Sequence, residues 1–181
     1  MDGIKIHNIK VSAKVPDTDL IRVEEELVER NIKHKRHNNF LVINKTYTYT
    51  LFKRCRQKLR LQHCNITKCK FETINDAVLE LTDIISCTKH DIKIIDVDNI
   101  TATFNLNHHV DLNTFLIIND HISNLTDYNA EVFPGVWITT PFGKTSLFRS
   151  GTLVMVGARS LKQVTSMKMW VMQKCVFTKI H

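Results

Sequence analysis

The sequence has few of the residues that make linkers and tails: 5 glycines and 3 prolines among 181 residues. No apolar run approaches the roughly 18–20 residues that a membrane-spanning helix needs, and the opening residues MDGIKIHNIK lack the long apolar core of a secretory signal. The five cysteines are too few, and odd in number, for a disulfide framework, which favours a reducing compartment. We therefore expect one folded, intracellular, basic domain.

Acidic side chains are missing from one long stretch. Residues 30–70 contain twelve Lys or Arg and no Asp or Glu, which leaves 13 basic against 18 acidic side chains in the rest of the chain. The net charge of +7 is thus concentrated in one segment, and the remainder carries −5. A basic segment of this kind is either a solvated face or a contact surface for a polyanion, and its complete lack of acids favours nucleic acid.

The usual signatures of catalysis and of metal binding are also missing. The sequence has no Gly-rich phosphate loop, no nucleophile elbow and no acid pair of recognisable spacing, so we expect no enzyme and no cofactor. Cys64 and Cys69 lie near His63 and Cys55, but the spacing is loose for zinc and no second cysteine pair exists. We expect ordinary buried thiols there and no metal.

What the sequence does contain is one series of elements that occurs twice. The pattern predicts a strand over residues 4–15, a helix capped within the segment Asp17-Thr18-Asp19, strands within 40–69, and a helix over 74–85. The second half repeats the series, with a strand over 93–106, a helix capped by Asp111 that carries Phe115 and Ile122, strands within 132–158, and a last helix capped by Ser160.

Individual residues recur between the halves at offsets of 91, 93 and 96. The matched pairs are Asn8 with Asn99, Phe40 with Phe133, and Phe52 with Phe148. Such near-constant offsets indicate a duplicated unit of about ninety residues. We therefore predict repeats at 1–90 and 91–181 that form one composite domain.

Strand side chains alternate between two faces. In the segment from residue 47 to 52, Tyr47, Tyr49 and Leu51 point one way and suit a core under helices. Thr50 and Phe52 point the other way, and helices on one side of an antiparallel sheet would leave that face open. The open face is dry, weakly polar and uncharged at its centre, which is unlike a phosphate-binding surface.

Such a face suits the minor groove of A·T-rich DNA, whose floor shows only hydrogen-bond acceptors. Asn can donate to those acceptors, methyl groups can lie against the groove, and Phe can wedge between base steps. The residues that this alternation predicts to contact DNA are Asn8, Lys10, Thr50, Phe52, Asn65, Thr67, Asn99, Thr101, Ser146, Phe148, Val154 and Val156. The residues predicted to contact phosphates are Lys53, Arg54, Arg149 and Arg159.

The segment EVFPGVWITTPFGKTSLFRSGTLVMVGARS, residues 131–160, resembles the core of the TATA-box-binding protein family. The likeness lies in its Phe-Pro-Gly strand, its Phe-x-Ser-Gly hairpin and its closing Gly-Ala-Arg, and the two-repeat plan extends it over the whole chain. The resemblance implies an α+β fold: two pseudo-symmetric repeats that form a saddle of curved antiparallel sheet, with helices on the convex face. It also implies a transcription initiation factor that binds and bends promoter DNA.

The resemblance further assigns roles to residues and partners. Phe40, Phe52, Phe133 and Phe148 would be the wedges, and Asn8 with Asn99 the central asparagines. Glu131 would lie in the loop that binds a B-type initiation factor, and the RNA polymerase machinery would be a further partner.

Several residues depart from the family. Lys10 stands where the family has Val, Asn65 replaces an apolar residue, Val156 is the counterpart of Thr67, and Thr139 stands in place of an Arg. The first repeat also has about seven extra residues in the basic hairpin 53–60, KRCRQKLR. Such divergence is typical of a fast-evolving or virus-encoded relative, which would act in the nucleus or in a cytoplasmic virus factory.

Two other functions stay open at this point. The groove face could have become a protein-interaction module of a transcription complex with weak or nonspecific DNA binding, which Lys10, Asn65 and Val156 would favour. Alternatively, residues 30–70 alone could act as a nonspecific nucleic-acid binder.

Overall fold

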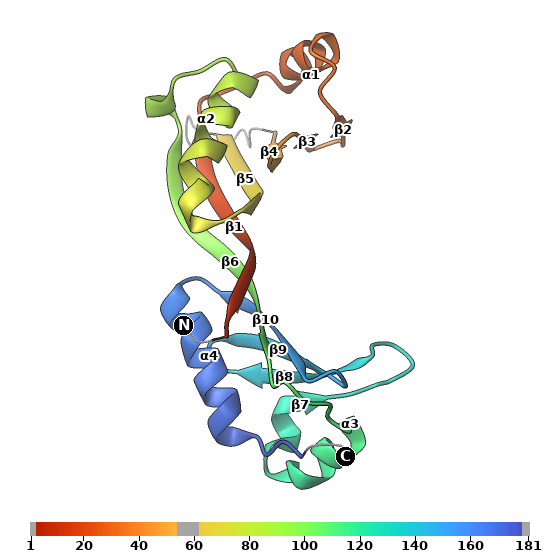
Figure 1. Ribbon diagram of the computed structural model, residues 1–181. Helices are drawn as coiled ribbons and strands as arrows, with labels where there is room; N and C mark the ends of the chain where they lie inside the picture. Colours follow the sequence, from red (N-terminus) through yellow and green to blue (C-terminus); the bar gives the residue numbers. More distant parts are fainter. Residues whose placement is uncertain (1–2, 54–61, 179–181) are drawn as a thin grey trace. The chain divides into compact units, whose positions relative to one another are not determined.

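The computed structural model describes residues 3–53 and 62–178 of the chain (Figure 1). Two compact units divide it: the N-terminal unit, Asn8–Asp98, and the C-terminal unit, which combines Asn99–His181 with Met1–His7. Strands β1 (Lys5–Val15) and β6 (Lys93–Asn105) each contribute residues to both units. The predicted repeat boundary at residue 90 stays a prediction.

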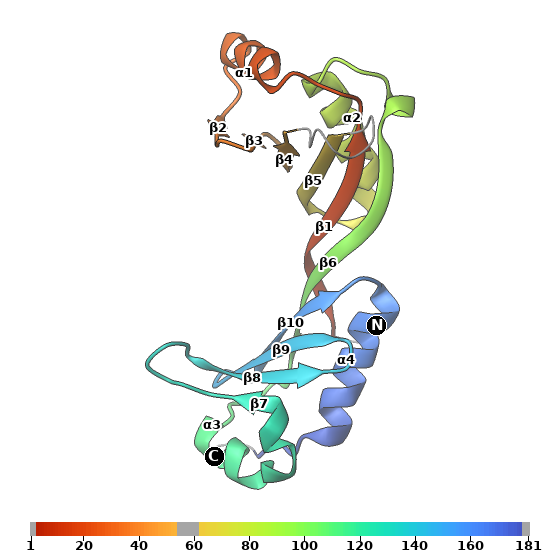
Figure 2. The ribbon, with the colours of Figure 1, turned by 180° about the vertical axis from the view of Figure 1, so that it is seen from behind.

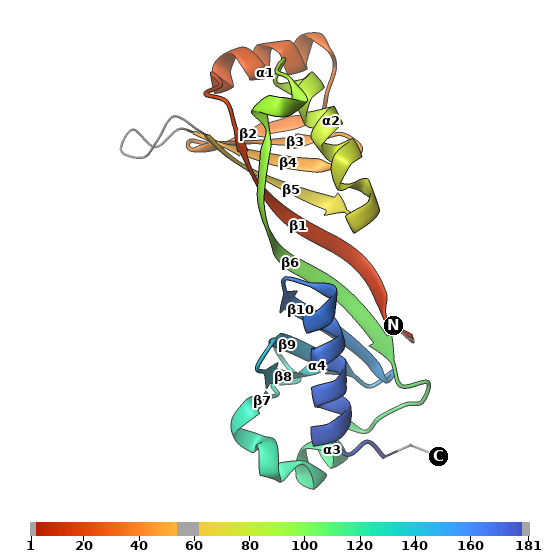
Figure 3. The same cartoon turned by 90° about the vertical axis from the view of Figure 1, so that its left-hand side faces the viewer.

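In the N-terminal unit, five strands are hydrogen-bonded side by side. Their order is β2 (His34–Arg36), β3 (Phe40–Asn44), β4 (Thr48–Phe52), β5 (Gln62–Cys69) and β1, each antiparallel to its neighbour. Helices α1 (Leu20–Glu29) and α2 (Ile74–Ile84) lie on the same side of these strands (Figure 3). Two short 3₁₀ turns, η1 (Phe71–Thr73) and η2 (Lys89–Asp91), flank α2.

The C-terminal unit has the same kind of arrangement. The strand order is β6, β10 (Thr152–Ala158), β9 (Gly143–Phe148), β8 (Gly135–Thr140) and β7 (Thr126–Asp127). Helix α4 (Leu161–Lys174) runs along one side of β8–β10, as Figures 1 and 2 show. Helix α3 (Leu112–Ile118) is followed by the 3₁₀ segment η3 (Asp120–Leu125). The helix predicted to carry Ile122 therefore ends earlier, and Ile122 itself has non-helical backbone angles inside η3.

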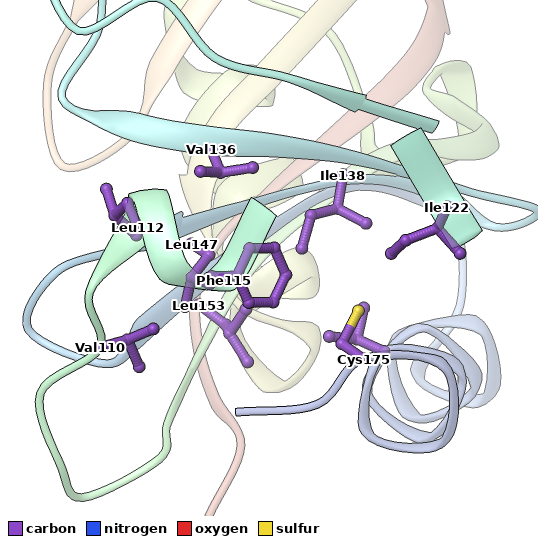
Figure 4. Packing of buried hydrophobic residues seen from close by; sticks show 10 residues of the cluster. Val110, Leu112, Phe115, Ile122, Val136, Ile138, Leu147, Leu153 and Cys175 are labelled. Atoms are coloured by element: carbon purple, nitrogen blue, oxygen red, sulfur yellow. The ribbon is translucent and has the colours of Figure 1, made fainter. Parts of the chain in front are cut away.

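Apolar alternation places each core on the helix side of its strands. Leu41, Tyr49, Leu51, Cys64 and Ile66 are fully buried in the N-terminal unit. In the C-terminal unit, Figure 4 shows Val136 and Ile138 of β8 and Leu147 of β9 gathered with Phe115, Ile122 and Cys175. The prediction that Tyr47, Tyr49 and Leu51 face the core is confirmed, because all three are buried while Thr50 and Phe52 are half-buried.

Local signals in the sequence set the ends of the elements. Asp111 and Ser160 each accept a backbone N–H of the following turn through the side chain, so these two predicted helix caps are confirmed. Within the predicted capping segment Asp17-Thr18-Asp19, the cap is Asp19, which accepts the N–H of Ile21. Gly151 has φ +78° in the predicted turn after β9, and a Cβ there would lie 2.0 Å from the carbonyl oxygen of His108. Only glycine therefore fits that turn.

Candidate nucleic-acid interface

The face of the N-terminal unit opposite its helices is the first candidate surface. Thr50 pairs with Val42 on β3 and with Asn65 on β5, and Asn65 pairs with Ser12 on β1. Thr48 pairs with Thr67 in the next row. Apart from Ser12, these residues are half-buried, while the alternate residues of the same strands form the core. We call this surface the N-terminal open face.

The C-terminal unit presents a matching row, the C-terminal open face. Ser146 pairs with Trp137 on β8 and with Val154 on β10, and Val154 pairs with Thr103 on β6. Val154, Thr103 and Trp137 are half-buried. Ser146 lies on the predicted face but keeps only 3% of its surface exposed, because its short side chain is flanked by larger neighbours. Its direct contribution to a contact surface is therefore small.

A central asparagine is fixed in the same way in each unit. The backbone N–H of Lys68 donates to Asn8 Oδ1 at 2.7 Å, and the backbone N–H of Gly157 donates to Asn99 Oδ1 at 2.6 Å. Lys68 and Gly157 both have positive φ, +63° and +96°, at points where the strand register shifts. Because a backbone N–H needs an acceptor, each amide oxygen is committed to the bulge. The NH₂ group of Asn99 reaches Thr101 Oγ1 at 3.5 Å with one N–H, and an amide NH₂ carries a second N–H that can donate elsewhere.

Two pairs of phenylalanines lie at the ends of these faces. The ring centroids of Phe40 and Phe52 are 5.8 Å apart, and those of Phe133 and Phe148 are 5.5 Å apart. All four rings are half-buried. Near the second pair stands Gly135, where a Cβ would approach both rings within 3.0–3.2 Å, so the missing side chain lets the rings meet.

The two pairs are not built identically. Phe40 begins β3 and pairs directly with Phe52, whereas the partner of Phe148 is Gly135, two residues after Phe133. Phe40 and Phe133 therefore do not hold equivalent places in the strand register, contrary to the sequence matching. The reason is that β3 starts at its phenylalanine while β8 starts beyond it.

Further aromatic rings extend both pairs, and the sequence reasoning missed them. Trp137 stacks on Phe133 at 4.7 Å between centroids, and His37 stacks on Phe40 at 4.3 Å. Strand alternation from Gly135 could have placed Trp137 on the open face. His37 precedes its strand, so no periodic signal marks it.

Basic residues stand beside the phenylalanines. Lys53 follows Phe52, Arg149 follows Phe148, and Arg159 follows β10; all three are exposed. The predicted phosphate contact Arg54 and most of the basic hairpin 53–60 lie outside the described residues.

Some basic side chains of residues 30–70 form ion pairs with acidic residues from other parts of the sequence. Arg30 and Lys45 both pair with Asp83, and Arg36 approaches Glu24 at 3.8 Å. The Arg30 and Lys45 hydrogen bonds hold the pKa of the Asp83 carboxyl below its usual value. These three cations are therefore engaged within the protein, and the charge available to a ligand is smaller than the sequence count.

Two further predicted site residues have distinct surroundings. Lys10 Nζ lies 3.4 Å from Asp98 Oδ2, so its charge is balanced locally. Glu131 is exposed in the turn before β8, next to Val132, and its backbone N–H donates to Asn129 Oδ1. The turn is open to a partner, and the role of Glu131 stays a prediction.

The thiols of Cys64 and Cys69, which the sequence predicts to be ordinary buried thiols, are buried. Burial raises the pKa of the Cys64 thiol to about 12 and raises that of Cys69 as well. A metal site needs thiolates, which these surroundings disfavour. Within residues 3–53 and 62–178, no three His, Cys, Asp or Glu side chains gather as metal ligands. No helix in this described part is long and apolar enough to cross a membrane.

Comparison with known proteins bears on the fold. Residues 94–172 match the family model described as transcription factor TFIID, or TATA-binding protein, TBP. No curated protein matches the chain in sequence. Among solved structures, the TBP of Methanococcus jannaschii matches with a TM-score of 0.70 and 22% identity, over 94% of this chain and 97% of that chain.

The structural likeness confirms the predicted fold, and the family match confirms the resemblance in the second half of the chain, where its motifs are clearest. The chain thus has the fold of the TATA-binding protein over nearly its whole length, and its residues 94–172 are similar to the TATA-binding protein family.

Proposed function

We propose that this protein binds A·T-rich duplex DNA in the minor groove, bends it, and acts as a TATA-binding-protein-like transcription initiation factor. The observation that carries the proposal is the repeated pairing of half-buried phenylalanines beside an open strand face in each unit. Aromatic rings are normally buried in cores. Two half-buried pairs, one at the end of each open face, are suited to insertion between base steps.

The central asparagines support the same proposal. With each amide oxygen bound to a backbone N–H, Asn8 and Asn99 present N–H donors. The minor groove at A·T pairs offers only acceptors, adenine N3 and thymine O2. The match of donors to acceptors favours A·T pairs near the centre of the site.

The proposal includes partners and a place of action. Bent promoter DNA would be bound by a B-type initiation factor through the turn that carries Glu131, and then by the RNA polymerase machinery. The protein would act in the nucleus, or in a cytoplasmic virus factory if a virus encodes it. No chemical step is required, since the protein works by binding and deformation.

A bending measurement tests the proposal. Energy transfer between dyes at the two ends of an A·T-rich duplex should rise when the full-length protein binds. Phe148→Ala should lower both the bend and the preference for A·T over G·C duplexes, while leaving the salt dependence nearly unchanged. Phe142→Ala, in the turn between β8 and β9, is the matched control and should bend DNA normally.

The phosphate contacts give an independent check on the same protein. Lys53→Ala should weaken binding to all sequences and reduce the salt slope by about one. If Phe148→Ala leaves bending and sequence preference intact, the wedge assignment is wrong.

A protein-interaction module remains the second candidate, because Lys10, Asp98 and Asn65 make one open face more polar than groove binding requires. Such a module would show no dependence of binding on A·T content. Selection of bound sites from random duplexes separates the two functions: an enriched A·T-rich sequence supports promoter binding, and an unenriched pool supports the module.

A further inference from the structure

The two open faces differ at positions that correspond in the strand register. The row Thr50–Asn65–Ser12 of the N-terminal unit corresponds to the row Ser146–Val154–Thr103 of the C-terminal unit. Asn65 thus stands where the other face has Val154. The two faces therefore offer different hydrogen-bonding groups to whatever they bind.

The residue before each central asparagine extends this difference. Asp98, before Asn99, accepts a hydrogen bond from Ser12 Oγ at 2.5 Å through Oδ2. His7, before Asn8, lies with Nε2 2.7 Å from Thr103 Oγ1. The same place thus holds a carboxylate over the N-terminal open face and an imidazole over the C-terminal one.

Lys10 completes the group on the N-terminal open face. Its Nζ lies 3.4 Å from the same Oδ2 of Asp98, and the two side chains are 39% and 31% exposed. Both described contacts of the carboxylate use Oδ2, and a carboxylate can accept about four hydrogen bonds. Since Lys10 balances the charge, Asp98 can stand near DNA phosphates without a net negative charge at that point.

The minor groove distinguishes G·C from A·T by one group, the guanine N2 amino donor. Against the methyl groups of Val154 and Val156, that donor would be desolvated without a partner, which is unfavourable. Against Asp98 it would find an acceptor.

We propose, on the basis of the proposed function, that Asp98 is a specificity-determining residue. Positioned by Ser12 and Lys10, it accepts a hydrogen bond from a guanine amino group. The half-site bound by the N-terminal unit therefore admits a G·C pair, and the half-site bound by the C-terminal unit requires A·T. A site with one G·C pair would then fix the direction in which this pseudo-symmetric protein lies on DNA.

Dissociation constants of the full-length protein on four related duplexes test the inference. The first is the A·T-rich site obtained by selection, the second has one G·C pair in one half, and the third has inosine·C at the same pair. The fourth has G·C in both halves. Inosine lacks the N2 amino group, so it isolates recognition of that group from other effects of the base change.

The wild-type protein should lose no more than about threefold on the single G·C duplex. It should lose about tenfold or more on the duplex with G·C in both halves, within the usual cost of a mismatched pair. Asp98→Ala should bind the single G·C duplex about tenfold more weakly than its own A·T site, and the inosine duplex should restore binding. Asp98→Asn, which keeps an acceptor oxygen, should retain G·C tolerance.

Asp120→Asn, an exposed carboxylate of η3, is the control for the change of charge and should behave as the wild type does. The inference is overturned if the wild type loses tenfold on the single G·C duplex, or if Asp98→Ala weakens A·T and G·C binding equally. If the wild type binds none of the duplexes, the proposed function itself fails, which is a separate result.

Discussion

The bulge-bound asparagines lead to a sharp prediction, because one substitution separates their structural role from their proposed contact with DNA. Asn99→Asp keeps the shape of the side chain and keeps an oxygen that can accept the Gly157 N–H now donated at 2.6 Å. It removes the amide donor and adds a negative charge. The fold should therefore survive the change while DNA binding does not.

The expected changes in stability and in DNA affinity follow from the hydrogen bonds that Asn99→Asp keeps and removes. A hydrogen bond from the Gly157 N–H to a carboxylate is at least as strong as the hydrogen bond to the amide oxygen that it replaces. The free energy of unfolding should therefore change by less than about 1 kcal/mol. Loss of donors to the bases costs about 1–3 kcal/mol, and the new charge is repelled by phosphates. Affinity for the A·T-rich duplex should thus fall at least about tenfold, since 1.4 kcal/mol corresponds to a factor of ten.

Urea unfolding gives the first quantity, and fluorescence anisotropy with a labelled A·T-rich duplex gives the second. Asn113→Asp, at an exposed position of α3, introduces the same charge outside the open faces and serves as the control. Asn8→Asp, whose oxygen accepts from Lys68, should behave as Asn99→Asp does. Tight binding by Asn99→Asp at normal stability would refute the donor role; a large loss of stability would refute the assignment of the oxygen to the bulge.

Three further predictions concern stability. Tyr49→Phe should lower the free energy of unfolding by about 1 kcal/mol, because the buried hydroxyl lies 2.9 Å from Ala77 O and 3.0 Å from Glu80 Oε1; urea titration checks this, and DNA affinity should not change. Gly151→Ala should cost at least about 2 kcal/mol, since φ is +78° and the new Cβ would meet His108 O; a thermal unfolding midpoint equal to that of the wild type would contradict it. The lowered pKa of Asp83 means that its pairing with Arg30 and Lys45 stabilises the fold above the usual aspartate pKa of 3.8 and is lost as the pH falls through the depressed value. Asp83→Asn should therefore reduce stability at pH 7 and have little effect at the acid end, by urea unfolding at both pH values.

Much of the fold could be predicted from local patterns. Alternation in β4 correctly separated Tyr49 and Leu51 from Thr50, and the caps at Asp19, Asp111 and Ser160 fixed three helix starts. These signals depend on neighbours within a few residues, where sequence spacing and spatial spacing are linked. The early end of α3 was not predicted, because Ile122 fits the helical spacing of apolar residues although its backbone angles are not helical.

The sequence allowed us to predict which candidate site residues lie on the open face, but not which side chains contact one another. The alternation of side chains along a strand placed Asn65, Thr67 and Val154 correctly on the open side of their strands. It could not show that Lys10 meets Asp98, because these residues are 88 positions apart and only strand pairing brings them together. The same limit applies to the basic segment, whose lack of internal acids concealed the pairing of Arg30 with Asp83.

The register of the phenylalanines shows why a repeat in sequence need not be a repeat in geometry. Matching by residue type aligned Phe40 with Phe133, yet the pairing across the strands aligns Phe40 with Gly135. Both arrangements bring two rings within 6 Å, one by direct pairing and one over a missing side chain. If wedging depends on the exposed edge of a ring pair and not on its place in the strand, both ends should kink DNA. Comparing Phe40→Ala with Phe133→Ala in the bending assay decides this: equal losses support the shared ring pair as the functional unit, and a loss confined to Phe133 would mean that the strand position is what matters.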